Sequence, residues 1–154
     1  MTRLFALSLI VAFAAWPASA QQIDWKAECD ADAAKGCVAR TSIGYRVGTM
    51  LMVAPKMLTV SVKDDVAKPL VSMRLADTEV RYAQVRLDQP TKSSDMVCDG
   101  VDCTMSFADA RATIDGMKAG RRVAILLFTN NGQLVQVGLS STGFAEAVAR
   151  TRPN

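Results

Sequence analysis

Residues 121–139 read RRVAILLFTNNGQLVQVGL, which is the strongest indication of local structure in the chain. Every position from 123 to 128 is apolar, which predicts a strand that is covered on both faces. From 135 to 139, apolar residues alternate with Gln and Gly, as expected of a half-buried partner strand. The Asn-Asn-Gly sequence at 130–132 tolerates the positive φ of a tight turn. We therefore predict a β-hairpin at the core of the fold.

Alternating or strand-like sequences recur before this hairpin. Over 38–53, the interruptions at Gly44 and Gly48 predict either one strand with a kink or two short strands joined by a turn. Further strands are predicted at 58–62, 70–75 and 80–87. In the last of these strands, Val80 and Tyr82 are out of phase with Val85 and Leu87, which predicts a bulge near Ala83-Gln84. The segment 89–102 has no periodicity and is expected to form the longest loop.

Two short helices are predicted near the C-terminus. Ala110, Ile114 and Met117 follow helical spacing, with Asp109 as the expected N-cap and Gly120 after the last turn. An alanine-rich helix should start near Ser141 or Thr142. Many short strands with two short helices predict a mainly antiparallel β sandwich or barrel. Trp25 is expected to be a packing anchor.

The first 20 residues have the three parts of a secretory signal. They are a basic start at 1–3, an apolar run from Leu4 to Ala15, and Ala18-Ser19-Ala20. The apolar run is too short to cross a bilayer core of about 30 Å as a helix. We expect a signal peptide at 1–20 that is removed before Gln21, which leaves a single soluble exported domain at 21–154 with no transmembrane segment.

The charge of the chain gives no indication of a nucleic-acid partner. The formal net charge is +3, and the charged residues are interspersed along the sequence rather than collected in blocks. Binding to a phosphate backbone requires a basic patch or stripe. We therefore expect no nucleic acid among the partners.

Four cysteines in an exported chain indicate two disulfides. Three pairings are open, and we favour Cys29 with Cys37 and Cys98 with Cys103, because each pair is near in sequence and bracketed by turn-forming residues. Asp99 and Asp102 beside the second pair disfavour the thiolate that redox chemistry needs. The cysteine spacing is also unlike that of zinc sites.

Composition excludes the commonest catalytic systems. The chain has no histidine, which removes Ser-His-Asp and Cys-His nucleophiles as well as histidine-based metal sites. No Ser-x-x-Lys occurs in a helical context. We therefore predict that the protein is not an enzyme and has no catalytic residues.

Two groups of residues could in principle bind a metal ion, one calcium and the other copper. Asp95, Asp99 and Asp102 lack the order of an EF-hand loop, so a solvated loop is favoured over a calcium site. On a strand, Met50 and Met52 would point the same way, and two thioethers suit Cu(I), but core packing is favoured because no histidine or free cysteine is evident to complete the site. We expect no metal and no cofactor.

One set of residues occurs in a characteristic order along the chain: Trp25, Cys29, Gly36-Cys37, Cys98, Cys103, Asp109, Lys118-Ala119-Gly120, Gly132-Gln133 and Ser140-Ser141-Thr142-Gly143-Phe144. With these residues in this order, the chain resembles the invasion associated locus B family of exported bacterial proteins. The resemblance spans the mature chain and is most specific from Cys103 to Val148.

This resemblance implies an immunoglobulin-like antiparallel β sandwich in the periplasm or outer envelope, or secreted, with no catalytic residues to transfer. The family is linked to host-cell invasion in pathogens, although no residue of this chain indicates a role in adhesion. The resulting hypothesis is a non-enzymatic envelope protein that binds a protein or another envelope component. The alternatives are a periplasmic copper-binding or thiol-redox protein that uses Met50 and Met52 or the cysteines, and an adhesin exposed to a host.

Overall fold

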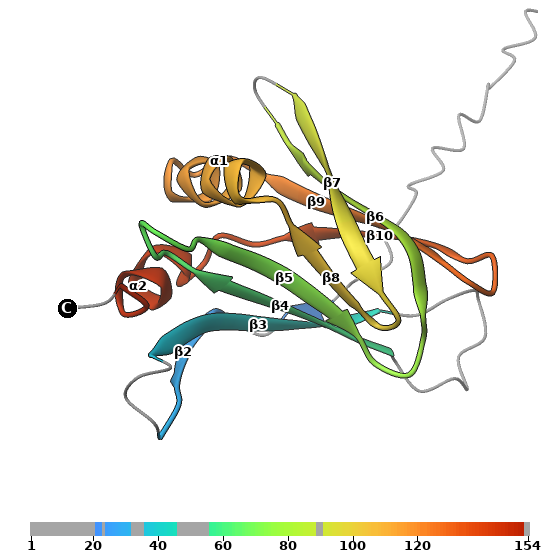
Figure 1. The fold of residues 1–154 in the computed structure, drawn as a ribbon, viewed down its shortest axis with the longest axis horizontal. Helices are drawn as coiled ribbons and strands as arrows, with labels where there is room; N and C mark the ends of the chain where they lie inside the picture. The colour runs from blue at the N-terminus through green and yellow to red at the C-terminus, as the bar shows by residue number, and fades with distance from the viewer. Residues whose placement is uncertain (1–20, 23, 32–35, 46–55, 89–90, 153–154) are drawn as a thin grey trace, which may run out of the picture.

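The computed structural model describes residues 21–22, 24–31, 36–45, 56–88 and 91–152. Within these residues, ten strands form one antiparallel sheet, and two short helices accompany it (Figure 1). The strands are β1 Gln21–Gln22, β2 Lys26–Cys29, β3 Cys37–Tyr45, β4 Lys56–Lys63, β5 Leu70–Leu75, β6 Val80–Leu87, β7 Lys92–Asp99, β8 Asp102–Met105, β9 Val123–Thr129 and β10 Leu134–Leu139.

The sheet is continuous and curls into a half-barrel (Figure 1). Its strand order is β1-β3-β4-β5-β8-β7-β6-β9-β10, and β2 also pairs with β3. The prediction of a mainly antiparallel β fold with two short helices is confirmed, whereas an immunoglobulin-like sandwich is not. Alternation in a sequence identifies the inward face of each strand. It does not say where hydrogen bonding between neighbouring strands stops, and here β8 joins β5 to β7 without a break.

Alternate side chains of each long strand fill the concave side of the sheet. Leu58, Val60 and Val62 of β4 are buried together with the inward residues of β5, as predicted. On β9, Ile125 and its inward neighbours are buried, but the residues between them are only half-buried. The prediction that β9 is covered on both faces is therefore correct for one face only.

The β9–β10 hairpin is confirmed, but only one of the three turn residues at 130–132 has the positive φ that the Asn-Asn-Gly sequence tolerates. Gly132 alone in the turn has positive φ, +81°, and its N–H donates to the carbonyl of Thr129 at 3.0 Å. Asn130 instead donates its backbone N–H to the carbonyl of Glu79 at 3.1 Å. The turn is thereby attached to the start of β6.

Two predictions between residues 80 and 105 are wrong. The irregularity in β6 lies between Val80 and Tyr82, before the expected position, so Val80 points inward and Tyr82 outward. The expected loop at 89–102 contains β7 and the start of β8 instead. Of the side chains of β7 that point inward, Ser94 is polar, and this hides the alternation.

Helix α1, Phe107–Lys118, follows β8 directly. Its N-cap is Ser106 rather than the predicted Asp109, which lies in the first turn and donates its backbone N–H to Ser106 Oγ at 3.3 Å. Gly120 follows the C-cap with φ +78°, as predicted. The helix packs against β5, and its Gly116 approaches the side chain of Leu87.

Helix α2, Phe144–Ala149, is the predicted terminal helix, and it contacts β2, β3 and α1. Both helices lie at the same end of the sheet (Figure 1). Trp25 is the anchor that the sequence predicted. Its buried ring meets that of Phe144 edge-on at 4.9 Å, and its Nε1 donates to the carbonyl of Ser140 at 2.8 Å.

Candidate binding surface

Four outward-facing apolar side chains, three exposed and one half-buried, form a row across the outer face of β10, β9, β6 and β7. Leu134 lies opposite Phe128 in the β10–β9 pair, and Phe128 lies opposite Tyr82 in the β9–β6 pair. Continued by one residue beyond Ala83 and Met96, the β6–β7 register brings Val97 next to Tyr82. Val97 is 76% exposed, Leu134 65% and Tyr82 40%. We refer to Leu134, Phe128, Tyr82 and Val97 as the apolar row.

A small hydrogen-bonded cluster fixes the centre of the apolar row. The Tyr82 hydroxyl donates to Asp95 Oδ1 at 2.6 Å, and Gln84 Nε2 donates to the same carboxylate oxygen at 3.0 Å. The hydrogen bond from Tyr82 lowers the pKa of Asp95, and the same bond raises the pKa of Tyr82. At neutral pH, Asp95 is therefore charged and Tyr82 is an intact phenol, so the aromatic ring is held in one orientation.

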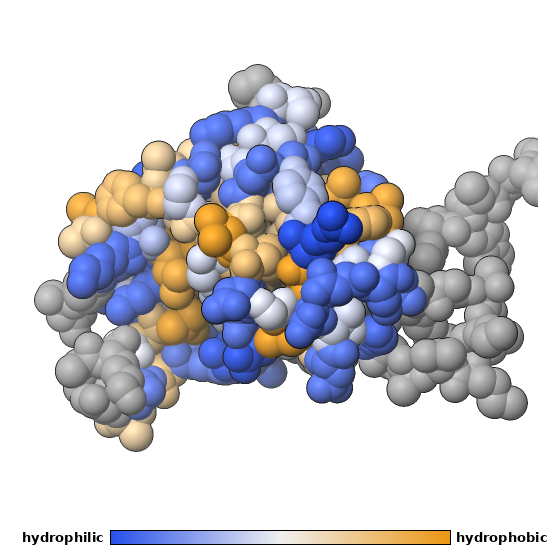
Figure 2. All heavy atoms as spheres, turned by 45° about the vertical axis from the view of Figure 1, so that its right-hand side comes forward, coloured by the Kyte–Doolittle hydropathy of each residue, from blue (hydrophilic) through white to orange (hydrophobic). Residues whose placement is uncertain are grey.

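Apolar and polar groups are mixed on the surface of the protein. On the face drawn in Figure 2, apolar side chains come to the surface in a broken band between hydrophilic ones. The apolar row has the same character, because Asp95, Gln84 and Gln136 lie beside it. Apolar groups that are bordered by polar ones are typical of surfaces that bind other proteins.

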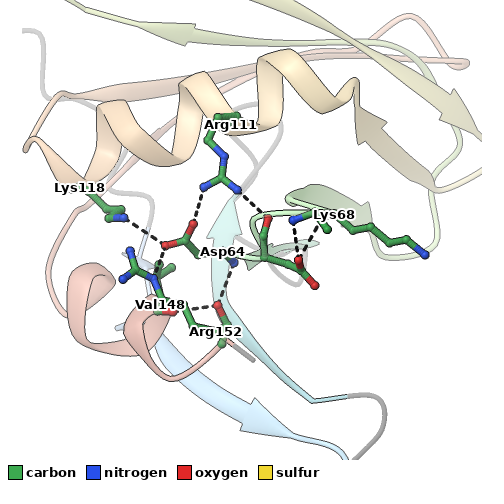
Figure 3. Close-up of polar contacts among 9 residues, drawn as sticks. Asp64, Lys68, Arg111, Lys118, Val148 and Arg152 are labelled. Carbon is green, nitrogen blue, oxygen red and sulfur yellow. Dashed lines mark hydrogen bonds and ion pairs between the residues drawn. The ribbon is translucent and has the colours of Figure 1, made fainter. Parts of the chain in front are cut away.

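A second constellation surrounds Asp64 in the turn after β4. This carboxylate is 2% exposed and contacts three cations: Arg111 Nη1 at 2.6 Å, Lys118 Nζ at 3.1 Å and Arg152 Nε at 3.0 Å (Figure 3). The backbone N–H of Asp64 donates to Thr151 Oγ1 at 2.9 Å. We call this group the Asp64 cluster.

The Asp64 cluster joins three parts of the chain. Asp64 lies at the end of β4, Arg111 and Lys118 extend from α1, and Arg152 follows α2 (Figure 3). Burial raises the pKa of Asp64, but the hydrogen bonds from Lys118, Arg152 and Arg111 outweigh it and lower the pKa below its usual value. At neutral pH, Asp64 is therefore a charged anchor between helices and sheet, and its oxygens are already occupied by these cations.

A groove of about 330 Å³ lies between β2 and α2. Trp25, Lys26, Ala27, Gly143, Glu146, Ala147 and Arg150 line it. Its one carboxylate, Glu146, is bonded to Arg150 at 2.9 Å. The lining therefore offers a paired acid and base instead of an activated nucleophile.

Comparison with known proteins identifies the family. The family model described as "Invasion associated locus B (IalB) protein" matches residues 25–152. The chain belongs to the invasion associated locus B family. Neither the curated proteins nor the solved structures gave a match to it.

The two disulfides predicted for this IalB family member are present. Cys29 is bonded to Cys37 and Cys98 to Cys103, and in each pair the cysteines occupy directly opposite positions of neighbouring strands. The Cα atoms are 3.9 Å and 4.0 Å apart. Each bridge therefore joins two adjacent strands in register, and none of these four sulfurs is a thiol.

The aspartates considered for calcium do not converge in this IalB protein. Asp95 is bonded to Tyr82, whereas Asp102 accepts two hydrogen bonds from the Arg74 guanidinium, at 2.7 and 2.8 Å. Asp99 pairs with Asp102 across the strands without sharing a ligand site. Among the described residues, no group of three or more acidic, cysteine or histidine side chains is placed to hold a metal ion.

Other predicted features of this IalB protein lie outside the described residues. These are the signal peptide at 1–20 and the methionine pair Met50 and Met52. In the part of the chain that the structure describes, neither helix is long and apolar enough to cross a membrane.

The sequence singled out neither Asp64 nor the apolar row. The cations that meet Asp64 are 47, 54 and 88 residues away in sequence, so no local pattern announces them. The apolar row depends on the register of four strands, one of which was predicted to be a loop. One indication was present in the sequence: Leu134 is adjacent to Val135 and therefore falls on the opposite, outward face of the strand.

Proposed function

We propose that this member of the IalB family is a non-enzymatic protein of the bacterial envelope. It acts after export, in the periplasm or at the outer envelope, and it binds another protein of the envelope through the apolar row. The proposal extends family membership, which concerns the chain as a whole, to a particular surface and a particular kind of partner.

The observation that carries the proposal is the exposure of Val97, Tyr82 and Leu134 in one line across four strands. Burying an exposed valine or leucine side chain contributes about 1.5–3 kcal/mol. Tyrosine is enriched at protein interfaces because its ring is apolar and its hydroxyl forms hydrogen bonds. Because Asp95 and Gln84 already orient Tyr82, binding costs little additional ordering of that side chain.

Two observations support a non-enzymatic role. The sequence has no histidine, and the carboxylate of Asp64 is already paired with three cations. The alternative of a thiol-redox protein is not favoured by the bonded cysteines. The link of the family to host-cell invasion in pathogens supports a role at the envelope.

The test uses two valines of similar exposure. Val97 lies in the apolar row, and Val66, 81% exposed, lies in the turn between β4 and β5. Photo-crosslinking from position 97 in the native envelope should trap a defined protein. In a separate measurement, Val97→Asp should reduce the capture of that protein by the full chain at least about tenfold.

Val66→Asp is the matched control and should leave that capture unchanged. Equal capture by the two variants, or a trapped species that is not a protein, would contradict the proposal.

A further inference from the structure

The two ends of the sheet differ in how they are protected against further strand pairing. At one end, β1 has only two residues and β2 four, and Glu28 of β2 is paired with Arg40 of β3. Short strands and charged side chains are the usual means by which proteins block an edge. At the other end, β10 has six residues, and residues 130–143 include no charged residue and no proline.

The backbone of β10 has unpaired groups along this open edge. Within the described residues, β10 pairs with β9 alone. Thr129 N–H donates to the carbonyl of Gln133 at 3.0 Å, and hydrogen-bonded pairs alternate along an antiparallel ladder. Val135 and Val137 therefore bond to β9, while the N–H and C=O groups of Leu134, Gln136 and Gly138 point away from it.

The side chains of β10 are complementary to a second copy of the same strand. In an antiparallel pair centred on Gln136, Val135 lies opposite Val137 of the other copy, and Leu134 lies opposite Gly138. A Cβ placed on Gly138 would have no neighbour within 4 Å, so the outer face is open there, and Leu134 is 65% exposed. The bulky residue of each copy thus lies above the open position of the other.

This reciprocal fit is what a two-fold symmetric interface requires, because each residue must accept its partner in both directions. Gln136 meets its own copy at the axis, where two neutral amides can exchange hydrogen bonds. The ladder would gain about six hydrogen bonds between the chains, from the three outward-pointing residues of each strand.

We propose that two copies of this chain associate through antiparallel pairing of β10 with β10, centred on Gln136, so that the two curled sheets become one continuous sheet. The proposal shares Leu134 with the apolar row, but it also needs the backbone groups of the β10 edge and the open position at Gly138, which the binding role of the apolar row does not use. A heterologous extended peptide would also find these backbone groups, but it would lack the reciprocal fit of Leu134 and Gly138.

The experiment measures the mass of the full mature chain with oxidised disulfides by sedimentation. An interface formed mainly by one pair of six-residue strands is small and its association is reversible, so concentrations from about 5 to about 500 μM are needed. The mass should rise from monomer toward dimer over this range. Gln136→Lys places two like charges at the axis and should weaken the association at least about tenfold.

A charge-swap mixture separates this geometry from others. Gln136→Lys and Gln136→Glu should each remain monomeric, and an equimolar mixture of the two should dimerise again. Thr104→Lys, an exposed residue of β8 in the middle of the outer face, is the matched control and should dimerise like the unmodified chain.

Three results would overturn the proposal. They are a monomer at every concentration, a Gln136→Lys variant that dimerises normally, and a mixture that fails to recover the dimer. Loss of partner capture in Val97→Asp with the dimer intact would concern the apolar row alone, so the two proposals fail separately.

Discussion

Replacing Asp64 by asparagine should destabilise the fold substantially. Asparagine keeps the size of the side chain and one acceptor oxygen, but it removes the charge and presents an N–H₂ group to the cations of the cluster. Removing one partner from a buried ion pair costs about 3–5 kcal/mol, because the remaining charge is left uncompensated. Here Arg111, Lys118 and Arg152 are 28%, 32% and 57% exposed, so water hydrates them in part after the change.

The expected loss is therefore smaller than for a fully buried pair, about 2–3 kcal/mol of unfolding free energy. For a domain of this length, that loss lowers the midpoint of thermal unfolding by about 6–12 °C. Far-UV circular dichroism during heating at pH 7 measures the midpoint, and urea titration measures the free energy. The control is Asp102→Asn, which removes an exposed ion pair with Arg74 and should leave the midpoint nearly unchanged.

The pH dependence gives a second measurement on the same variant. The pKa of Asp64 is lowered in the folded protein, so its stabilisation is fully present above the unfolded pKa of about 4 and is lost as the pH falls through the folded pKa. The difference in stability between the unmodified chain and Asp64→Asn should therefore shrink below about pH 4. An Asn variant within about 0.5 kcal/mol of the unmodified chain at pH 7, or one matching Asp102→Asn, would refute the reasoning.

Three further substitutions test other parts of the fold. Replacing both Cys98 and Cys103 by alanine should cost about 2 kcal/mol in urea titration, since the bridge closes a short loop; an unchanged midpoint would count against that role. Gly143→Ala should cost about 1–3 kcal/mol, because φ is +75° and the new Cβ would lie 3.3 Å from the carbonyl oxygen of Trp25, whereas Gly120→Ala at φ +78° meets no atom within 4 Å and should cost less. Trp25→Phe removes the indole N–H bond to the carbonyl after β10 and should cost about 1–3 kcal/mol, with a normal far-UV spectrum; a gain in stability would contradict the anchoring role.

The strands that the sequence predicts well are those with apolar residues on one face only. Leu58, Val60 and Val62 alternate with polar residues, and the structure buries these three. The same reasoning fails for β7, where Ser94 is buried because its hydroxyl donates to Asp109 Oδ1 at 3.0 Å. A polar residue that is buried by bonding to a distant partner leaves no periodic signal in the sequence.

The surfaces that matter for function were less predictable than the strands. The position of the β6 irregularity decides whether Tyr82 joins the core or the apolar row, and alternation alone placed it with Val80. The open edge of β10 depends on its place at the end of the sheet, which follows from long-range pairing. The disulfides were predictable because their partners are only 8 and 5 residues apart.

The Asp64 cluster also sets the order of events during biosynthesis. Arg152 and Thr151 emerge from the ribosome after every strand of the sheet, and until they arrive the turn after β4 has neither its last cation nor the hydroxyl that receives its N–H. The nascent chain therefore remains incompletely locked throughout its synthesis.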